Sequence, residues 1–576
     1  MSTVAKMIVT ALADQGVRTV WGVVGDALNP VTDAIREEER LEWIGVRHEE
    51  VAAFAAGAQA QLTGTVGVCM GTVGPGSVHL LNGLYDAKKS HAPVLAICGQ
   101  VPLADLGSDM FQEVDNDLLF RDVACFTRTV TSAEQATSLV EQALQSAYVA
   151  PGVAVLTLPG DVGSLELPED ASPPNVMVAH PPTSPDTPAL RRAAKLINDA
   201  KNVTLLVGIG AREARGEVLA VAEALRAPMV LTLKAKENLE RDNDFQVGQS
   251  GLIGNPAAQL ALESCDLLLM VGTDFPYREW YPKGKTVIQI EARPEHIGRR
   301  THVDLGLVGH SAPTLSALAG HLKAKKSDKH LKLSRKLYAE WLERQHKLAR
   351  ADYDKTLIGR VREKFDNSSD RIRPEALARA LEQAADDDAI FTTDTGMSTV
   401  WLSRFVMMTG TRRLLGSFNL GSMANAMPQA LGAQALDRTR QVIAFCGDGG
   451  LSMLLGDLLT AVAYDLPVKL VVFDNGRLGM VKLEQEQGGL PEFGTVLQNP
   501  DFAAVARAIG LHGVRVEDPA ELDDAVRAAL AHPGPVLLDV LTNPEEISVP
   551  GKVKPGQAWG FAIAKMRETV LSQGDA

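Results

Sequence analysis

The chain has 576 residues, enough for three or four domains, and its 45% hydrophobic content is ordinary for a soluble globular protein. Asp and Glu number 71 against 57 Lys and Arg, so the formal charge is −14 and nucleic-acid binding is not expected. No apolar run reaches the roughly 18 residues of a spanning helix, and the N-terminus lacks the form of a signal peptide. The five cysteines are scattered without a CxxC pair, which predicts buried free thiols in a reducing cytoplasm.

Short runs of aliphatic and β-branched residues alternate with alanine-rich helical stretches along the whole chain. Clear strand-like runs are Val153–Leu158, Val203–Val207, Leu267–Val271, Val468–Phe473 and Val536–Val540. Glycine-rich turns follow several of them, while aromatic residues make up only 5% of the chain. This alternation predicts an α/β protein built from doubly wound parallel sheets.

Two polar stretches divide the pattern into blocks. Residues 167–188 carry seven prolines and are interpreted as an extended linker. Residues 323–370 are rich in charged side chains, with helical spacing around Tyr338, Trp341 and Leu342. The predicted organisation is a first domain at 1–170, a central domain at 185–325, a helical connector at 326–369, a third domain at 370–550 and a short C-terminal segment at 551–576.

The first and third blocks resemble each other internally. Each contains a glycine turn, an amphipathic stretch and a strand that begins with proline: Gly71–Gly76, Ser77–Lys89 and Pro93–Ile97 in the first, and Gly447–Gly450, Leu451–Tyr464 and Pro467–Phe473 in the third. Such units are either recurrent βαβ motifs or two related domains that together enclose one ligand.

The glycine turn of the third block predicts a site for a diphosphate and a cation. Gly447, Asp448, Gly449 and Gly450 follow the strand-like run 441–446, so a helix begins there with unpaired N–H groups that favour a phosphate. The next strand ends before Asn475. Since the ends of neighbouring parallel strands share one sheet edge, Asp448, Asn475 and the carbonyl of Arg477 are expected to bind one Mg²⁺.

A GDG turn followed about 25 residues later by asparagine resembles the signature of thiamine-diphosphate enzymes. That signature usually ends in Asn-Asn, whereas this chain has Asp474 before Asn475; a solvent-facing Asp474 would change little. Gly421, Ser422 and Met423 resemble the segment whose methionine supports the bent cofactor. The resemblance also assigns cofactor contacts to Gly476, Leu478, Gly479, Met480 and Val481.

The segment Arg47–Gly57 resembles the family's segment that carries the activating carboxylate, and Glu49 occupies the catalytic position. The carboxylate is expected to share a proton with N1′ of the aminopyrimidine, aided by the small apolar residues that follow. The alternative, an ordinary acidic first turn of a helix, fits Glu50 well. Because the family pairs the first domain of one subunit with the third domain of another, the resemblance implies at least a dimer and predicts a homotetramer.

Almost the whole chain resembles the pyruvate oxidases, and most of all their pyruvate:quinone oxidoreductase branch. The segments concerned are Trp21–Asp26, Arg47–Gly57, Gly74–Gly76 with His79, Leu414–Asn419 and Gly421–Gln434. The resemblance places Phe111, Gln112 and Glu484 near a small 2-keto acid, pyruvate, and includes His79 and Met480 in the catalytic region.

The central block resembles the FAD-binding domain of the same branch. A glycine turn after a strand, two loop segments and a carboxylate at a strand end match FAD-contacting positions. They are Gly208, Gly210, Ala211, Arg212, Ser250, Gly251, Leu252, Ile253, Thr273, Asp274, Phe275, Pro276, Tyr277 and Glu291. The family usually has Asp where Glu291 stands, and either carboxylate can accept a ribose hydroxyl.

The resemblance implies that pyruvate is decarboxylated with thiamine diphosphate and that FAD passes the electrons to quinone, oxygen or another acceptor, with acetate or acetyl phosphate as product. Two features depart from the branch. Met480 stands where the branch has phenylalanine, and the lipid-binding C-terminal tail has no counterpart before Ala576. A cytoplasmic protein without a stable membrane anchor is therefore expected.

Two other functions compete with the oxidase. An acetolactate synthase-like carboligase would also bind thiamine diphosphate and a non-redox FAD, and the run Leu478–Val481 resembles that family. The synthases continue with Gln-Trp, whereas this chain has Leu483 and Glu484. A non-catalytic binding protein would have little need of Glu49, yet the chain contains it together with Asp448 and Asn475.

Overall fold

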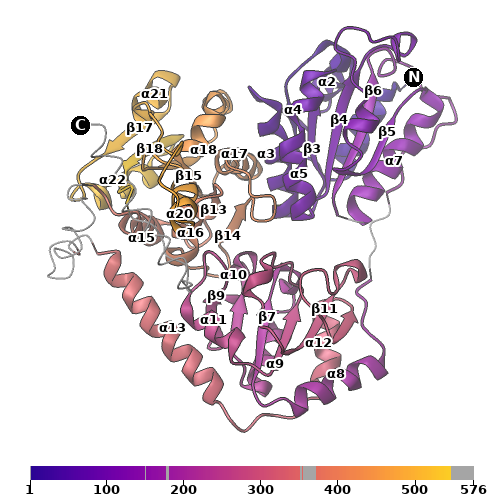
Figure 1. Ribbon diagram of the computed structural model, residues 1–576. Helices are drawn as coiled ribbons and strands as arrows, with labels where there is room; N and C mark the ends of the chain where they lie inside the picture. Colours follow the sequence, from indigo (N-terminus) through magenta and orange to yellow (C-terminus); the bar gives the residue numbers. More distant parts are fainter. Residues whose placement is uncertain (1, 150, 177–180, 351–352, 354–370, 546–576) are drawn as a thin grey trace.

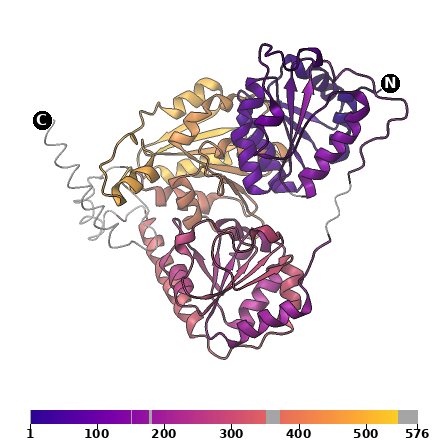
Figure 2. The ribbon, with the colours of Figure 1, turned by 45° about the vertical axis from the view of Figure 1, so that its right-hand side comes forward.

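The computed structural model describes residues 2–149, 151–176, 181–350, 353 and 371–545. These residues form three six-stranded sheets in succession, with helices packed on the sheets (Figure 1). Neighbouring strands in each sheet are parallel. The α/β, doubly wound fold predicted from the sequence is confirmed. The central sheet lies below the other two in both views (Figures 1 and 2).

The first sheet has the strand order β2-β1-β3-β4-β6-β5. Its strands are β1 Thr19–Gly22, β2 Glu42–Gly45, β3 Gly67–Gly71, β4 Val94–Gln100, β5 Ala124–Thr129 and β6 Val153–Pro159. Its helices are α1 Val4–Asp14, α2 Asn29–Glu37, α3 Glu49–Thr63, α4 Pro75–His79, α5 Leu81–Ser90, α6 Asn116–Leu119 and α7 Ala133–Val149.

The central sheet has the order β12-β11-β10-β7-β8-β9. Its strands are β7 Val203–Val207, β8 Met229–Leu231, β9 Gln246–Gln249, β10 Leu267–Val271, β11 Thr286–Glu291 and β12 Leu305–Val308. The helices of this part are α8 Thr187–Asp199, α9 Arg215–Leu225, α10 Lys236–Leu239, α11 Pro256–Glu263, α12 Ser311–Ala319 and α13 Lys329–Leu348.

The third sheet has the order β14-β13-β15-β16-β18-β17. Its strands are β13 Ile390–Thr393, β14 Arg413–Gly416, β15 Val442–Gly447, β16 Lys469–Asp474, β17 His512–Val516 and β18 Val536–Leu541. Its helices are α15 Pro374–Ala384, α16 Met397–Phe405, α17 Ala426–Leu436, α18 Asp448–Met453, α19 Leu458–Ala463, α20 Gly479–Gln487, α21 Phe502–Ile509 and α22 Leu522–Ala531. When β13 is counted as the first strand, the third sheet has the same strand order as the first sheet. This agrees with the internal resemblance between the two blocks.

The central strands of each sheet are buried on both faces, which explains their continuous aliphatic sequences. All residues of β4, β6, β7 and β10 are buried. A strand covered by helices on both sides needs no polar alternation. Burial of these apolar side chains is the main stabilising contribution to the fold.

Helices α3 and α17 join the first and third domains through small residues. A Cβ added at Gly432 of α17 would lie 2.4 Å from the backbone oxygen of Ala55 in α3, so the two helices approach closely only because glycine is there. The amide of Gln59 donates to the Gly432 carbonyl at 3.1 Å. Alanines of both helices belong to one hydrophobic core that spans the two domains. This contact fixes the position of Glu49, the first residue of α3.

Both amphipathic stretches form helices that are interrupted. Ser77–Lys89 is divided between α4 and α5, and Leu451–Tyr464 is broken by a 3₁₀ turn at Leu455–Asp457. At the second break the Asp457 carboxylate accepts the backbone N–H of Arg47 at 2.8 Å. The interruption thus gives the third domain a polar contact with the first.

Four cysteines are buried as predicted, but Cys125 is exposed, which corrects the expectation for that thiol. It lies on β5, an edge strand of the first sheet, where burial is incomplete. Helix α13 occupies the predicted connector, and its Tyr338 packs into a core of the central domain. Connector residues 351–352 and 354–369, and all of 551–576, lie outside the described residues. Among the described helices, none has the length and apolar character needed to cross a bilayer.

Candidate active site

The glycine turn after β15 positions Asp448 beyond the carboxyl ends of the strands of the third sheet. Asp448 is 3% exposed; its Oδ1 accepts the N–H of Gly449 at 2.8 Å and its Oδ2 accepts the N–H of Gly476 at 2.7 Å. Burial raises the pKa of Asp448 to about 6; a hydrogen bond from Asn499 lowers it, and the charge of Asp474 adds to the rise. The second of these backbone bonds joins the turn to the loop after β16. The sequence prediction that these two loops meet is confirmed.

One cavity contains the residues predicted to hold the cation and the diphosphate. Asp448, Asn475 and Arg477 line it, together with Gly449, Gly450, Gly421 and Met423. Asn475 Oδ1 accepts the Arg477 N–H at 2.9 Å, which orders the loop. A Cβ added at Gly449 would lie 3.0–3.2 Å from the side chains of Met423, Leu478 and Leu497, so a larger residue there would have to displace them. The donor set of carboxylate and amide oxygens fits a hard divalent cation such as Mg²⁺.

Asp394 lines this cavity and is not among the residues predicted for the site. Its carboxylate accepts the N–H of Ala426 at 2.9 Å through Oδ1 and the N–H of Gly447 at 3.0 Å through Oδ2. A Cβ added at Gly450 would lie 2.3 Å from Oδ2. Complete burial raises the pKa of Asp394 to about 7, against the opposing effect of these backbone hydrogen bonds. One side chain therefore connects the helix after Met423 to the glycine turn.

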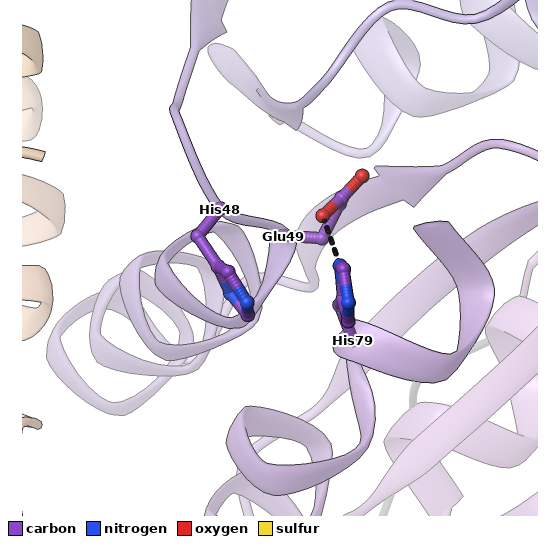
Figure 3. A group of neighbouring side chains, drawn as sticks. All are labelled: His48, Glu49 and His79. Carbon is purple, nitrogen blue, oxygen red and sulfur yellow. Dashed lines mark hydrogen bonds and ion pairs between the residues drawn. The ribbon is translucent and has the colours of Figure 1, made fainter. Parts of the chain in front are cut away.

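Glu49 begins α3 and is 7% exposed. His79 Nδ1, at the end of α4, lies 2.9 Å from Glu49 Oε2, as Figure 3 shows. The His48 ring stacks on His79 with centroids 4.4 Å apart, and its Nδ1 accepts the Glu50 N–H at 3.2 Å, which caps the helix. The arrangement holds one carboxylate oxygen in place against an imidazole.

Phe111 and Gln112 lie in a loop of the first domain. Phe111 is 83% exposed, and Gln112 has a left-handed backbone with φ of +68°. A Cβ added at Gly74 would lie 2.6 Å from the Gln112 carbonyl oxygen, so this glycine permits the loop to pack there. In the described part of one chain, neither Glu49 nor the pair Phe111 and Gln112 lines the cavity that contains Asp448.

A second cavity lies between the central and third domains. Seven of the residues predicted to contact FAD line it: Ser250, Leu252, Ile253, Asp274, Phe275, Pro276 and Tyr277. Apolar side chains dominate its wall, and Asp274 forms an ion pair with Arg300 at 3.3 Å. An elongated planar group with a polar edge fits this lining.

The other residues predicted for FAD lie along the same sheet edge but do not line that cavity. They are Gly208, Gly210, Ala211, Arg212, Gly251, Thr273 and Glu291. Val207, Val271 and Ile290 are in register, so the loops after β7, β10 and β11 leave the sheet side by side. The Arg212 guanidinium pairs with Glu237, and burial raises the pKa of Glu291. These positions suit the part of a dinucleotide that would extend beyond the second cavity.

Met480 lines both cavities, together with Thr395, Gly396 and Gly421. Glu484, one helical turn after Met480, lines the cavity with Asp448, and its charge acts with burial and Glu279 to raise the pKa of Tyr277. The two predicted cofactor sites therefore share a wall.

Several lining residues were missed although they follow strand ends. Lys234 comes after β8 and lines the second cavity, while Thr395 and Gly396 come after β13. The rule that ligands bind beyond the carboxyl ends of parallel strands would have found them. Asp474, by contrast, is buried, so the solvent-facing position considered from the sequence is not the one found. It is 7% exposed and bonded to Asn499 at 2.7 Å.

Models of three thiamine pyrophosphate enzyme domains match the chain in order. The N-terminal TPP-binding domain matches residues 2–119, the central domain 190–318 and the C-terminal TPP-binding domain 394–540.

Full-length relatives point the same way. The thiamine pyrophosphate-containing protein YdaP of Bacillus subtilis is 39% identical over 560 residues, which cover 97% of this chain and 95% of the relative. A pyruvate oxidase of Lactiplantibacillus plantarum is 31% identical, covering 93% and 87%. An acetolactate synthase large subunit of Parasynechococcus marenigrum is 32% identical, covering 99% and 92%. On this evidence the chain belongs to the thiamine-diphosphate-dependent enzymes.

Proposed function

We propose that this protein oxidatively decarboxylates pyruvate with thiamine diphosphate, Mg²⁺ and FAD, and that it belongs to the pyruvate:quinone oxidoreductase branch of the pyruvate oxidases. The shared wall of the two cavities carries the proposal. Met480, Thr395 and Gly396 separate the cavity with Asp448 from the cavity with the predicted flavin contacts. A flavin in such a place is within reach of electrons released beside the thiamine site.

Bound thiamine diphosphate would supply the carbon nucleophile and the electron sink for decarboxylation, and FAD would accept two electrons. Asp448, Asn475 and the Arg477 carbonyl would hold Mg²⁺ against the diphosphate. Met423 would support the cofactor where its side chain covers Gly449. Met480 lines both cavities, and its flexible thioether stands where the branch carries an aromatic ring.

Glu49 would exchange a proton with the aminopyrimidine. His79 bonds to its Oε2, so within the described residues Oε1 is the oxygen left to give or take the proton. Low exposure strengthens the hydrogen bond that a carboxylate makes to such a partner. Phe111, Gln112 and Glu484 would then contact the keto acid.

A dimer at least, and a homotetramer by analogy with the family, completes this site. Apolar side chains lie exposed near both halves in the single chain. Phe111 is 83% exposed in the first domain, and Phe493 and Val496 are 85% and 63% exposed beside the loop that contains Arg477. Facing the first domain of one subunit to the third domain of another would bury them and bring Glu49 to the cofactor.

An acetolactate synthase is the second candidate, because synthases match as much of the chain at the same identity as the pyruvate oxidase does. The product and acceptor profile of the purified protein with pyruvate, with and without phosphate, separates the two. We expect CO₂ and acetate, or acetyl phosphate when phosphate is required, together with reduction of a quinone, of oxygen or of an artificial acceptor. Accumulation of acetolactate without acceptor reduction would establish the carboligase instead.

A further inference from the structure

One side-chain amide connects two buried acids at the proposed cation site. Asn499 Nδ2 donates to Asp448 Oδ2 at 2.8 Å and to Asp474 Oδ1 at 2.7 Å. The two aspartates are 3% and 7% exposed. Asn499 reaches them from a segment that pairs back onto the metal loop, since the Leu497 N–H donates to the Gly476 carbonyl at 2.8 Å. Neither Asp474 nor Asn499 has a role in the function proposed above.

Asn499 determines how the Asp448 carboxylate is turned. Oδ2 accepts both from Asn499 and from the Gly476 N–H, which occupies its two lone pairs. Oδ1 accepts one hydrogen bond, from Gly449, and keeps a lone pair for a ligand. Loss of the Asn499 amide would therefore leave Oδ2 with the Gly476 hydrogen bond alone and free the carboxylate to turn.

Asp474 adds a second negative charge beside the first. Among the described residues, no Lys, Arg or His nitrogen lies within ion-pair distance of Asp448 or Asp474. Two arginines of this domain have other partners, because Arg477 pairs with Glu492 at 2.9 Å and Arg515 with Asp539 at 2.8 Å. Two buried carboxylates joined by one neutral amide repel each other, and a bound divalent cation relieves that repulsion.

We propose that Asp474 and Asn499 together set the divalent-cation affinity of this protein. Asn499 is a positioning residue that orients the Asp448 carboxylate, and Asp474 is a charge that tightens cation binding without being a ligand. This inference rests on the proposed Mg²⁺ site. An asparagine at 474 would keep the acceptor oxygen for Asn499 and remove only the charge, so Asp474→Asn isolates the electrostatic contribution.

The test is calorimetric titration of Mg²⁺ into the full-length protein saturated with thiamine diphosphate, which needs no turnover. We expect Asp474→Asn to weaken Mg²⁺ binding by about tenfold or more, given the strength of interactions between close charges in a buried site. Asp523→Asn is the matched control, because it removes one charge from an exposed position on α22 of the same domain. Its Mg²⁺ affinity should equal that of the wild type.

Asn499→Ala and the double variant test the connection between the two residues. We expect Asn499→Ala to weaken Mg²⁺ binding in the wild-type background, because the Asp448 carboxylate loses the hydrogen bond that orients it. The effect should be smaller beside Asp474→Asn, because the charge of residue 474 then no longer pushes the released carboxylate out of position. Wild-type affinity in Asp474→Asn, or strictly additive losses in the double variant, would overturn the inference. A wild-type protein that binds thiamine diphosphate without any Mg²⁺ would overturn the proposed metal site itself, which is a distinct outcome.

Discussion

Replacing Glu49 by glutamine is expected to abolish CO₂ release from pyruvate while thiamine diphosphate stays bound. Glutamine keeps the shape of the side chain but cannot take up and return a proton, and general acid–base groups contribute on the order of 10²–10⁴-fold to rates. The residues proposed to hold the diphosphate lie on the third domain, so the affinity for the cofactor should change little. Cofactor binding by calorimetry and CO₂ release by single-turnover assay measure the two effects separately.

Glu50→Gln is the matched control for this experiment. It removes the same charge one residue further along α3, where the carboxylate accepts a hydrogen bond from Asn82 at 2.7 Å that glutamine can also accept. The control should retain CO₂ release within a few-fold of the wild type. Wild-type rates in Glu49→Gln, or an equal loss in both variants, would remove Glu49 as the base.

Asp394 is expected to make the cofactor-free protein less stable as pH rises from about 4 to 7. Its pKa is raised to about 7 by burial, so the folded state holds a proton that the unfolded state has lost above about pH 4. The folded state binds more protons in this window, and its stability therefore falls with pH, by at most about 1.4 kcal/mol per pH unit from this group. Above about pH 7 the dependence from this group ends.

The difference between wild type and Asp394→Asn isolates that contribution. Asparagine does not titrate, but its amide nitrogen cannot accept one of the two backbone N–H groups, at a cost of about 1–3 kcal/mol. The variant should thus be less stable near pH 5, with a deficit that shrinks or reverses by pH 8. Urea unfolding of both cofactor-free proteins from pH 5 to 8 tests this, with Asp387→Asn, an exposed charge nearby, as the control. A pH-independent difference would show that Asp394 does not titrate there.

Sequence patterns predicted the sheets and the meeting of two loops at the candidate site, for a physical reason. A strand buried on both faces needs an unbroken aliphatic run, so Val203–Val207 and Leu267–Val271 match β7 and β10 residue for residue. The ends of parallel strands meet at one edge, and this alone predicted that Asp448 would approach the loop with Asn475.

Residues that reach the site from elsewhere gave no such signal. Asn499 follows a loop that folds back onto Gly476, and no local pattern predicts that return. The exposure of Cys125 depends on which strand lies at the sheet edge, which is a property of the topology. Asp394 is different, because it directly follows β13. The rule that ligands bind beyond the carboxyl ends of parallel strands would have identified it.

The central claim is that the two cavities that share Met480 form one redox site. Its most direct test is to mix the protein, loaded with thiamine diphosphate, Mg²⁺ and FAD, with pyruvate in the absence of oxygen and of any acceptor. We expect the flavin to lose its visible absorbance with one CO₂ released for each FAD reduced, and Glu49→Gln to leave the flavin oxidised. A flavin that stays oxidised in the wild type while acetolactate accumulates would contradict the claim.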